Sequence, residues 1–231
     1  MSPRYVGIKY EFDTKTPGKL AAMGIVMKRR DNAPITKVVY GGVLDEILLN
    51  KNVQAAAAFV RSSLMKLVDG DVPIEQLIIS KTLKGNYINP DSIVHAALAK
   101  RMRERDPGSA PQINDRVQYA FVVTDNPKAL QAQRVEDPKY IQEKKLPLDY
   151  AFYIKSQITE PVKQLFSLVV HELPGARTVG LDPRDDTPEA KKKALKNRED
   201  EVTRLLFQPA LDKIARKASN MHDMSYFFAP V

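Results

Sequence analysis

Positively charged side chains gather where the sequence predicts the ends of strands and helices, and such side chains can bind phosphate. The cations in these positions are Lys28, Arg29, Arg30, Lys81, Lys84, Arg101, Arg103, Arg105 and Arg116. A side chain at the end of an element can reach outward, and lysine and arginine give charge-assisted hydrogen bonds to phosphate oxygens. The same pattern is expected of solvated element ends whose charge complements a helix dipole. Residue spacing alone leaves both interpretations open.

The segment 106–115, which lies between two of these arginines, has the composition of a phosphate-binding loop. Its sequence is DPGSAPQIND, rich in Gly, Ser and Pro. Small residues let backbone N–H groups approach a phosphate closely, and the flanking arginines add charge. We therefore expect backbone contacts at Gly108 and Ser109. Asp106 and Asp115 are expected to hold the loop in shape.

The sequence offers no convincing catalytic or metal-binding arrangement. Its three histidines, His95, His171 and His222, lie far apart and share no metal-ligand spacing, and no P-loop or dinucleotide glycine pattern occurs. His95 is expected to be a structural hydrogen-bonding residue on a helix. Asp69 and Asp71 could hold a magnesium ion, but Asp-Gly-Asp is typical of a turn, which is the favoured interpretation.

Composition limits the class of protein. The chain has 231 residues, a formal net charge of +8 and no cysteine. This length allows one large or two small domains, without disulfides or thiolate zinc sites. The positive charge favours polyanionic partners. No apolar run is long enough to span a bilayer, and the first residues lack a signal-peptide core, so we expect an intracellular protein.

The elements that must position these residues form an α+β pattern that is mainly helical. Two strands, at 4–11 and 20–30, are expected to pair as a β-hairpin. The later elements are a helical stretch at 35–68 interrupted near 50–52, helices at 93–102 and 150–169, a strand at 116–123 and a helix from Thr187. Pro209 is expected to break or kink the last helix, because proline lacks a backbone N–H.

Several ordered motifs resemble the thumb of family B DNA polymerases, the replicative group that includes eukaryotic polymerase delta. The segment 92–122 reads SIVHAALAKRMRERDPGSAPQINDRVQYAFV and carries the family's RDPGSAP and DRVxY runs, with Asn114 where the family has Gly. Residues 27–34, 77–83 and 135–166 read MKRRDNAP, LIISKTL and VEDPKYIQEKKLPLDYAFYIKSQITEPVKQLF. They are similar to the family's palm-to-thumb step and to two thumb segments. These segments are most similar to polymerases of large nucleocytoplasmic DNA viruses.

The resemblance implies an organisation in three parts. Residues 1–33 would be the distal palm with its β-hairpin, 34–218 the mainly helical thumb, and 219–231 a C-terminal tail. The family's thumb holds primer-template duplex through its backbone, so base-specific contacts are not expected. The DNA-binding residues implied are Arg4, Tyr5, Lys28, Arg29, Arg30, Lys81, Arg105, Gly108, Ser109 and Arg116. Ser2 and Pro3 replace two lysines of the family's Lys-Lys-Arg-Tyr motif.

Catalysis is expected to need another chain or domain. The sequence has no Asp-Thr-Asp turn, fingers helix or exonuclease carboxylates at positions matching the family, and a two-metal mechanism needs acidic side chains. The chain is therefore expected to bind no cofactor itself. Mg²⁺ and deoxynucleoside triphosphate would be bound by the complete polymerase.

The end of the chain, MHDMSYFFAPV, suggests a second partner. Met224, Phe227 and Phe228 have the spacing of a sliding-clamp-binding peptide, with Met221 where that motif begins with Gln. Alternatively, these aromatic residues pack into the protein's own core. The chain could also be a clamp- or partner-docking adaptor derived from a thumb. An unrelated RNA-binding domain is disfavoured because no aromatic stacking pattern is present.

Overall fold

The computed structural model describes residues 5–10, 19–23, 26, 31–124, 126, 128–177 and 187–227, with the backbone alone for residues 5, 6, 19–23 and 220–227. Within these residues the chain is mainly helical with two small antiparallel sheets, which confirms the expected α+β class. No helix within the described ranges combines the length and the apolar character that a bilayer span requires.

The predicted N-terminal hairpin is present. Strand β1 (Tyr5–Lys9) pairs antiparallel with β2 (Lys19–Met23), in a register that sets Tyr5 opposite Met23. Residues 24, 25 and 27–30 of the predicted 20–30 strand lie outside the described residues. The cations expected at the end of that segment lie outside the described residues.

The first helical region has the predicted interruption. Helix α1 (Pro34–Leu44) continues into a π turn, Asp45–Leu49, and α2 (Val53–Asp69) follows. Asn52 caps α2 because its side chain accepts the Ala55 N–H at 2.9 Å, as expected of Asn at a helix start. Gly70 ends α2 with φ of 82°, a left-handed conformation that glycine adopts without strain.

Asp69 lies at the end of α2, just before the turn at Gly70, and its carboxylate bonds to two lysines of the last helix. It accepts hydrogen bonds from the amino groups of Lys213 and Lys217, each at 2.8 Å. These two lysines lower the pKa of the Asp69 carboxyl. In the described part of the chain, no three His, Asp or Glu side chains are grouped so that they could hold a metal ion.

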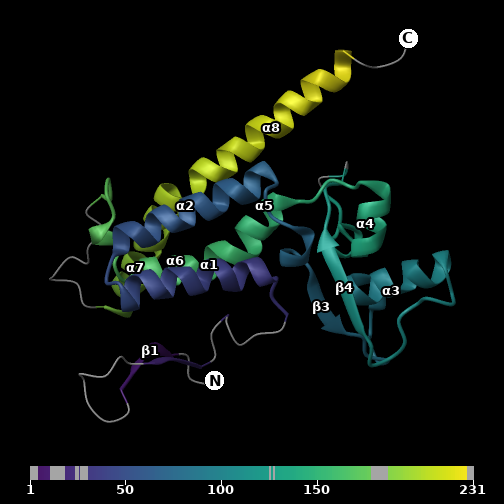
Figure 1. Cartoon of the computed structure of the whole chain (residues 1–231), viewed down its shortest axis with the longest axis horizontal. Helices are drawn as coiled ribbons and strands as arrows, with labels where there is room; N and C mark the ends of the chain where they lie inside the picture. The colour runs from purple at the N-terminus through teal and green to yellow at the C-terminus, as the bar shows by residue number, and fades with distance from the viewer. Residues whose placement is uncertain are drawn as a thin grey trace.

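The later helices pack beside α1 and α2 or on one another (Figure 1). They are α5 (Tyr150–Phe152), a π turn Tyr153–Ile158, α6 (Thr159–Phe166), α7 (Pro188–Val202), a π turn Thr203–Phe207 and α8 (Gln208–Phe227). The helix predicted to run to 169 ends at Phe166. The predicted helix start at Thr187 is confirmed, since the Thr187 hydroxyl accepts the Ala190 N–H at 3.2 Å.

Pro209 does not end the last helix, which continues through it as α8. The wider π turn just before it gives room for the ring.

The helices α1, α2 and α5 to α8 form a helical lobe, and a second lobe is built on a three-stranded sheet in the order β3-β4-β5 (Figure 1). The strands are β3 (Ile79–Thr82), β4 (Arg116–Phe121) and β5 (Val135–Glu136), with α3 (Val94–Arg105) and α4 (Pro138–Lys144) packed beside them. The β3–β4 register sets Thr82 opposite Arg116. One apolar core joins both lobes, and Tyr153, Phe166 and Phe207 are among its fully buried side chains.

Candidate nucleic-acid interface

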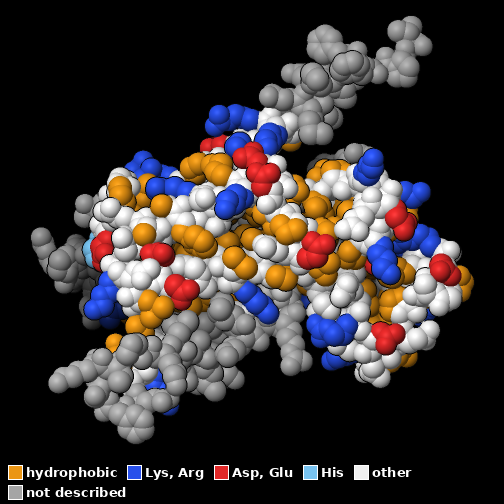
Figure 2. Space-filling model, viewed as in Figure 1, with side chains coloured by type: hydrophobic (Ala, Val, Ile, Leu, Met, Phe, Trp, Pro, Cys, Tyr) orange, Lys and Arg blue, Asp and Glu red, His pale blue; other side chains and the backbone are white. Residues whose placement is uncertain are grey.

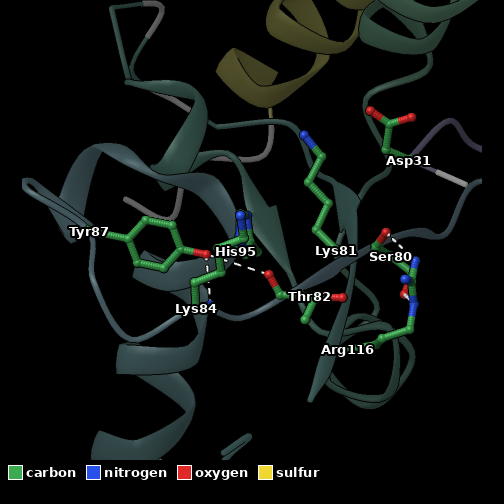
Figure 3. A pocket seen from close by; sticks show the side chains of 8 residues that line it. All are labelled: Asp31, Ser80, Lys81, Thr82, Lys84, Tyr87, His95 and Arg116. Carbon is green, nitrogen blue, oxygen red and sulfur yellow. Dashed lines mark hydrogen bonds between the residues drawn. The ribbon is translucent and has the colours of Figure 1, made fainter. Parts of the chain in front are cut away.

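A hollow of about 470 Å³ lies where β3, β4 and α3 meet the segment before α1. Its lining residues are Asp31, Ser80, Lys81, Thr82, Lys84, Tyr87, His95 and Arg116. Figure 3 shows Tyr87 and His95 on one side of this hollow, Arg116 on the other and Lys81 between them. Tertiary structure thus brings together Lys81 and Arg116, two of the predicted DNA-binding residues, which lie 35 positions apart in the sequence.

Strand pairing fixes Arg116 across β3. Its guanidinium donates from Nε to the Ser80 hydroxyl at 2.9 Å and from Nη2 to the Ser80 carbonyl at 2.8 Å. Since Arg116 is the cross-strand partner of Thr82, Ser80 is its diagonal neighbour and within reach of its long side chain. The guanidinium is therefore oriented before any ligand arrives.

The hollow is electrostatically positive. Lys81, Lys84 and Arg116 contribute three cations against the single carboxylate of Asp31. None of the ion pairs between described residues involves these three cations. Figure 2 shows that Lys and Arg side chains are otherwise scattered among acidic ones on the visible face. The hollow therefore combines concavity with an excess of positive charge.

A buried histidine of α3 lines the hollow. His95 is 8% exposed, and its Nε2 lies 2.8 Å from the Tyr87 hydroxyl, which also accepts the Lys84 N–H at 2.9 Å. Burial lowers the pKa of His95, the charge of Lys81 lowers it further, and the Thr82 backbone opposes both. The expected structural hydrogen bond of His95 is confirmed. Sequence reasoning missed Tyr87, although an aromatic hydroxyl in a polar loop beside two lysines was a usable signal.

The turn before Arg116 explains the departure from the family motif at Asn114. Asn114 has φ of 75°, and its N–H donates to the Leu83 carbonyl at 2.8 Å. A left-handed backbone suits glycine best, and asparagine is among the few other residues that adopt it readily. Asn at this position therefore keeps the turn that leads into β4.

The loop 106–115 is held by its own aspartates, as expected. The Asp106 carboxylate accepts the Gly108 N–H at 3.0 Å, and the Asp115 carboxylate accepts the Gln112 N–H at 2.8 Å. Hydrogen bonds from the Ser109 side chain and from Gly108 lower the pKa of Asp106. The Gly108 N–H thus has an acceptor inside the loop. The contacts of Gly108 and Ser109 with DNA stay predictions.

The arginines that end α3 do not join Arg116. The Arg105 guanidinium donates to Glu136 at 2.7 Å and lies 4.1 Å from the centre of the Tyr140 ring. Arg101 donates to the carbonyl oxygens of Ala132 and Val135 at 2.9 and 2.6 Å. Both side chains anchor α3 to β5 and its flanking turns, so Arg105 has an internal role. Its contact with DNA stays a prediction.

Replacing Arg105 with Ala is expected to lower the free energy of unfolding by about 1 kcal/mol, because a partly exposed ion pair and a cation–π contact are lost. Urea denaturation measures the change. Arg103→Ala is the matched control, because Arg103 is exposed and has no ion pair with another described residue. Equal losses for the two variants would contradict the anchoring role of Arg105.

The remaining predicted site residues cannot be placed by their side chains. Arg4, Lys28, Arg29, Arg30 and Phe228 lie outside the described residues. Tyr5 is described only as backbone in β1, and Met224 and Phe227 only as backbone in α8. Their contacts with DNA or a clamp stay predictions.

Comparison with known proteins gives one consistent result. A family model described as DNA polymerase family B matches residues 3–169. The chain is 39% identical over 238 residues to a DNA polymerase of Pyramimonas orientalis virus, covering 98% of the chain and 20% of that protein. It is 44% identical over 174 residues to a DNA polymerase of Acanthamoeba polyphaga mimivirus, covering 72% of the chain and 10% of that protein. It is also 35% identical over 170 residues to the DNA polymerase delta catalytic subunit of Candida albicans, covering 73% of the chain and 16% of that protein. The chain thus spans about a fifth or less of the length of these relatives.

Proposed function

The chain belongs to DNA polymerase family B, and we propose that it is the part of such a polymerase that grips primer-template duplex. In this proposal residues 1–33 are the distal palm, 34–218 the thumb and 219–231 a tail able to bind a sliding clamp. A catalytic chain or domain supplies the remaining palm, the fingers and the exonuclease, and binds Mg²⁺ and deoxynucleoside triphosphate. The setting is intracellular DNA replication.

The observation that carries the proposal is the positive hollow at the β3–β4 edge. Arg116 is held by Ser80, and Lys81 and Lys84 stand beside it around a space of about 470 Å³. Cations that are fixed at the rim of a concave surface suit phosphate oxygens. A polymerase must hold any sequence and then slide, and phosphate contacts give affinity without reading bases. The geometry therefore favours sequence-independent duplex binding.

Salt dependence tests this proposal. Duplex binding by the chain is measured by fluorescence anisotropy from 50 to 200 mM salt. Each phosphate contact that is lost should make the slope of log affinity against log salt less negative by about 0.9. Lys81→Ala and Arg116→Ala are each expected to produce this change, equally on unrelated DNA sequences.

Lys192→Ala is the matched control for charge. Lys192 is an exposed cation on α7, in the lobe away from the hollow (Figure 1). The control should leave the slope unchanged. If Lys81→Ala and Arg116→Ala behave like Lys192→Ala, the hollow does not hold DNA, and a docking adaptor derived from a thumb becomes the better explanation.

A further inference from the structure

The Tyr87 hydroxyl stands at a branch point of hydrogen bonds at the edge of the hollow. Its oxygen accepts the Lys84 N–H at 2.9 Å and lies 2.8 Å from His95 Nε2. Its proton has one further acceptor in the described part of the chain, the Thr82 carbonyl, at 3.5 Å. Tyr87 is half-buried and lines the hollow together with Lys81 and Lys84 (Figure 3).

The protonation state of His95 Nε2 decides whether the Tyr87 hydroxyl can donate a hydrogen bond to a ligand. When Nε2 carries no proton, the Tyr87 hydroxyl donates to it and has nothing left for a ligand. When Nε2 is protonated, it donates to the Tyr87 oxygen, both lone pairs of that oxygen are filled, and the hydroxyl proton turns to another acceptor. The other ring nitrogen, Nδ1, is buried and has no hydrogen-bond partner among the described residues, so Nδ1 does not fix the tautomer. Within the described part of the chain, the Thr82 backbone is the one internal group that favours a protonated ring.

We propose that Tyr87 is a ligand for a phosphodiester oxygen in this hollow, and that His95 is the positioning residue that directs the Tyr87 hydroxyl proton toward it. The proposal rests on the proposed duplex-binding function. It adds a neutral hydrogen-bond donor to a site otherwise made of cations. A phosphate held by Lys81, Lys84 and Arg116 would lie beside a hydroxyl that lines the same space.

The charges that face His95 determine how DNA affinity should change with pH. Lys81 from β3, Lys84 from the loop and Arg116 from β4 surround the same hollow, with Asp31 from the segment before α1. Without a ligand, burial and Lys81 disfavour the imidazolium form of His95. A bound phosphate supplies the opposite charge and favours that form. In the imidazolium both nitrogens are donors, so the Tyr87 proton must point away from His95. DNA affinity should therefore rise as pH falls.

Duplex binding by Tyr87→Phe shows whether the Tyr87 hydroxyl contacts the phosphate itself or only positions the lysines. The variant is expected to bind duplex DNA at least about tenfold more weakly, the effect of losing one hydrogen bond to a charged group. The salt slope should stay unchanged, because a neutral hydroxyl displaces no counterions. An unchanged affinity overturns the proposal. A slope that becomes less negative by about 0.9 or more also overturns it, because Tyr87 would then act only by positioning lysines.

The pH profile tests the role of His95. From pH 8 to 5.5, binding by the wild-type chain should tighten severalfold, and Tyr87→Phe should abolish most of this change. His95→Gln keeps a donor near Tyr87 but does not titrate, so its affinity should be nearly independent of pH. His171→Gln is the control, since His171 is 74% exposed and pairs with Glu172 away from the hollow. A pH profile that is the same in the wild type and Tyr87→Phe overturns the positioning role, whatever the stability of the His95 variant.

These outcomes are distinguishable from failure of the proposed function. If the wild-type chain binds no duplex at any salt concentration, both the function and this inference fail. If the wild type binds with a salt slope that depends on Lys81 and Arg116, while Tyr87→Phe has no effect, only the inference fails.

Discussion

Replacing Tyr153 with Phe is expected to lower the free energy of unfolding by about 2–4 kcal/mol, although it removes a single oxygen atom. Tyr153 lies in the π turn between α5 and α6, is fully buried, and joins the two lobes. Its hydroxyl accepts the Phe121 N–H of β4 at 2.9 Å and donates to the Leu77 carbonyl at 2.8 Å. Burial raises the pKa of this phenol, so the group stays protonated and able to donate.

The size of the effect follows from the two backbone groups left behind. Phenylalanine fills the same space but gives neither Phe121 nor Leu77 a partner, and each unsatisfied buried group costs about 1–3 kcal/mol. The loss would loosen the contact between the helical lobe and β4, the strand that begins with Arg116. Duplex binding should weaken only under conditions where unfolded protein accumulates, because no residue lining the hollow is changed.

Chemical denaturation measures this change, with Tyr150→Phe as the matched control. Tyr150 is only partly buried, and its hydroxyl makes no hydrogen bond with another described residue. The same chemical change there should alter the free energy of unfolding by less than about 0.5 kcal/mol. A Tyr153 variant as stable as the Tyr150 variant would show that the two lobes do not depend on this bridge.

Glu201→Gln is expected to be the second large effect, with a loss of about 1–2 kcal/mol at neutral pH, since charged hydrogen bonds are the strong ones. The Glu201 carboxylate is nearly buried at 6% exposure. It accepts from Arg204 Nε at 2.9 Å and Nη2 at 2.6 Å, and from the Arg177 N–H at 2.8 Å. Arg204 also donates to the Gly175 carbonyl at 2.9 Å, so this network ties the segment before α7 to the helix itself.

The pH dependence of this effect has a definite sign. Hydrogen bonds from Arg204 and Arg177 lower the pKa of Glu201 from 4.5 to about 2, against the opposing effect of burial. The folded protein therefore binds fewer protons at this site than the unfolded chain. The stability that Glu201 contributes is complete above pH 4.5 and is lost as pH falls toward 2.

Unfolding measured from pH 7 to 2 checks this prediction. The wild type should lose stability more steeply below pH 4.5 than Glu201→Gln, so the difference between them should shrink on acidification. Glu143→Gln, an exposed position on α4, is the control and should follow the wild type. If the difference between wild type and Glu201→Gln stays constant down to pH 2, the carboxylate is not the titrating group.

Local chemistry made many features of this fold predictable. The helix start at Thr187, the interruption before Val53 and the turn at Gly70 all follow from side chains that bond to nearby backbone groups or from glycine's freedom at positive φ. Asn114 has a positive φ, which asparagine adopts more readily than most other residues, so Asn can stand where the family has Gly. These features depend on neighbours within a few positions, so sequence spacing is sufficient to find them.

Sequence by itself determined the family, most of the helices, the strand at β4 and the presence of cations near element ends, but not the two-residue strand β5. Only tertiary structure decided which cations face the same space. Arg101 and Arg105, one helical turn apart, both turn toward β5, and Arg105 is held there by Glu136. The β3–β4 register instead sets Arg116 beside Ser80 and near Lys81, where the loop carrying Tyr87 closes the hollow. The direction of a long side chain depends on partners that are distant in the chain, and residue spacing does not encode them.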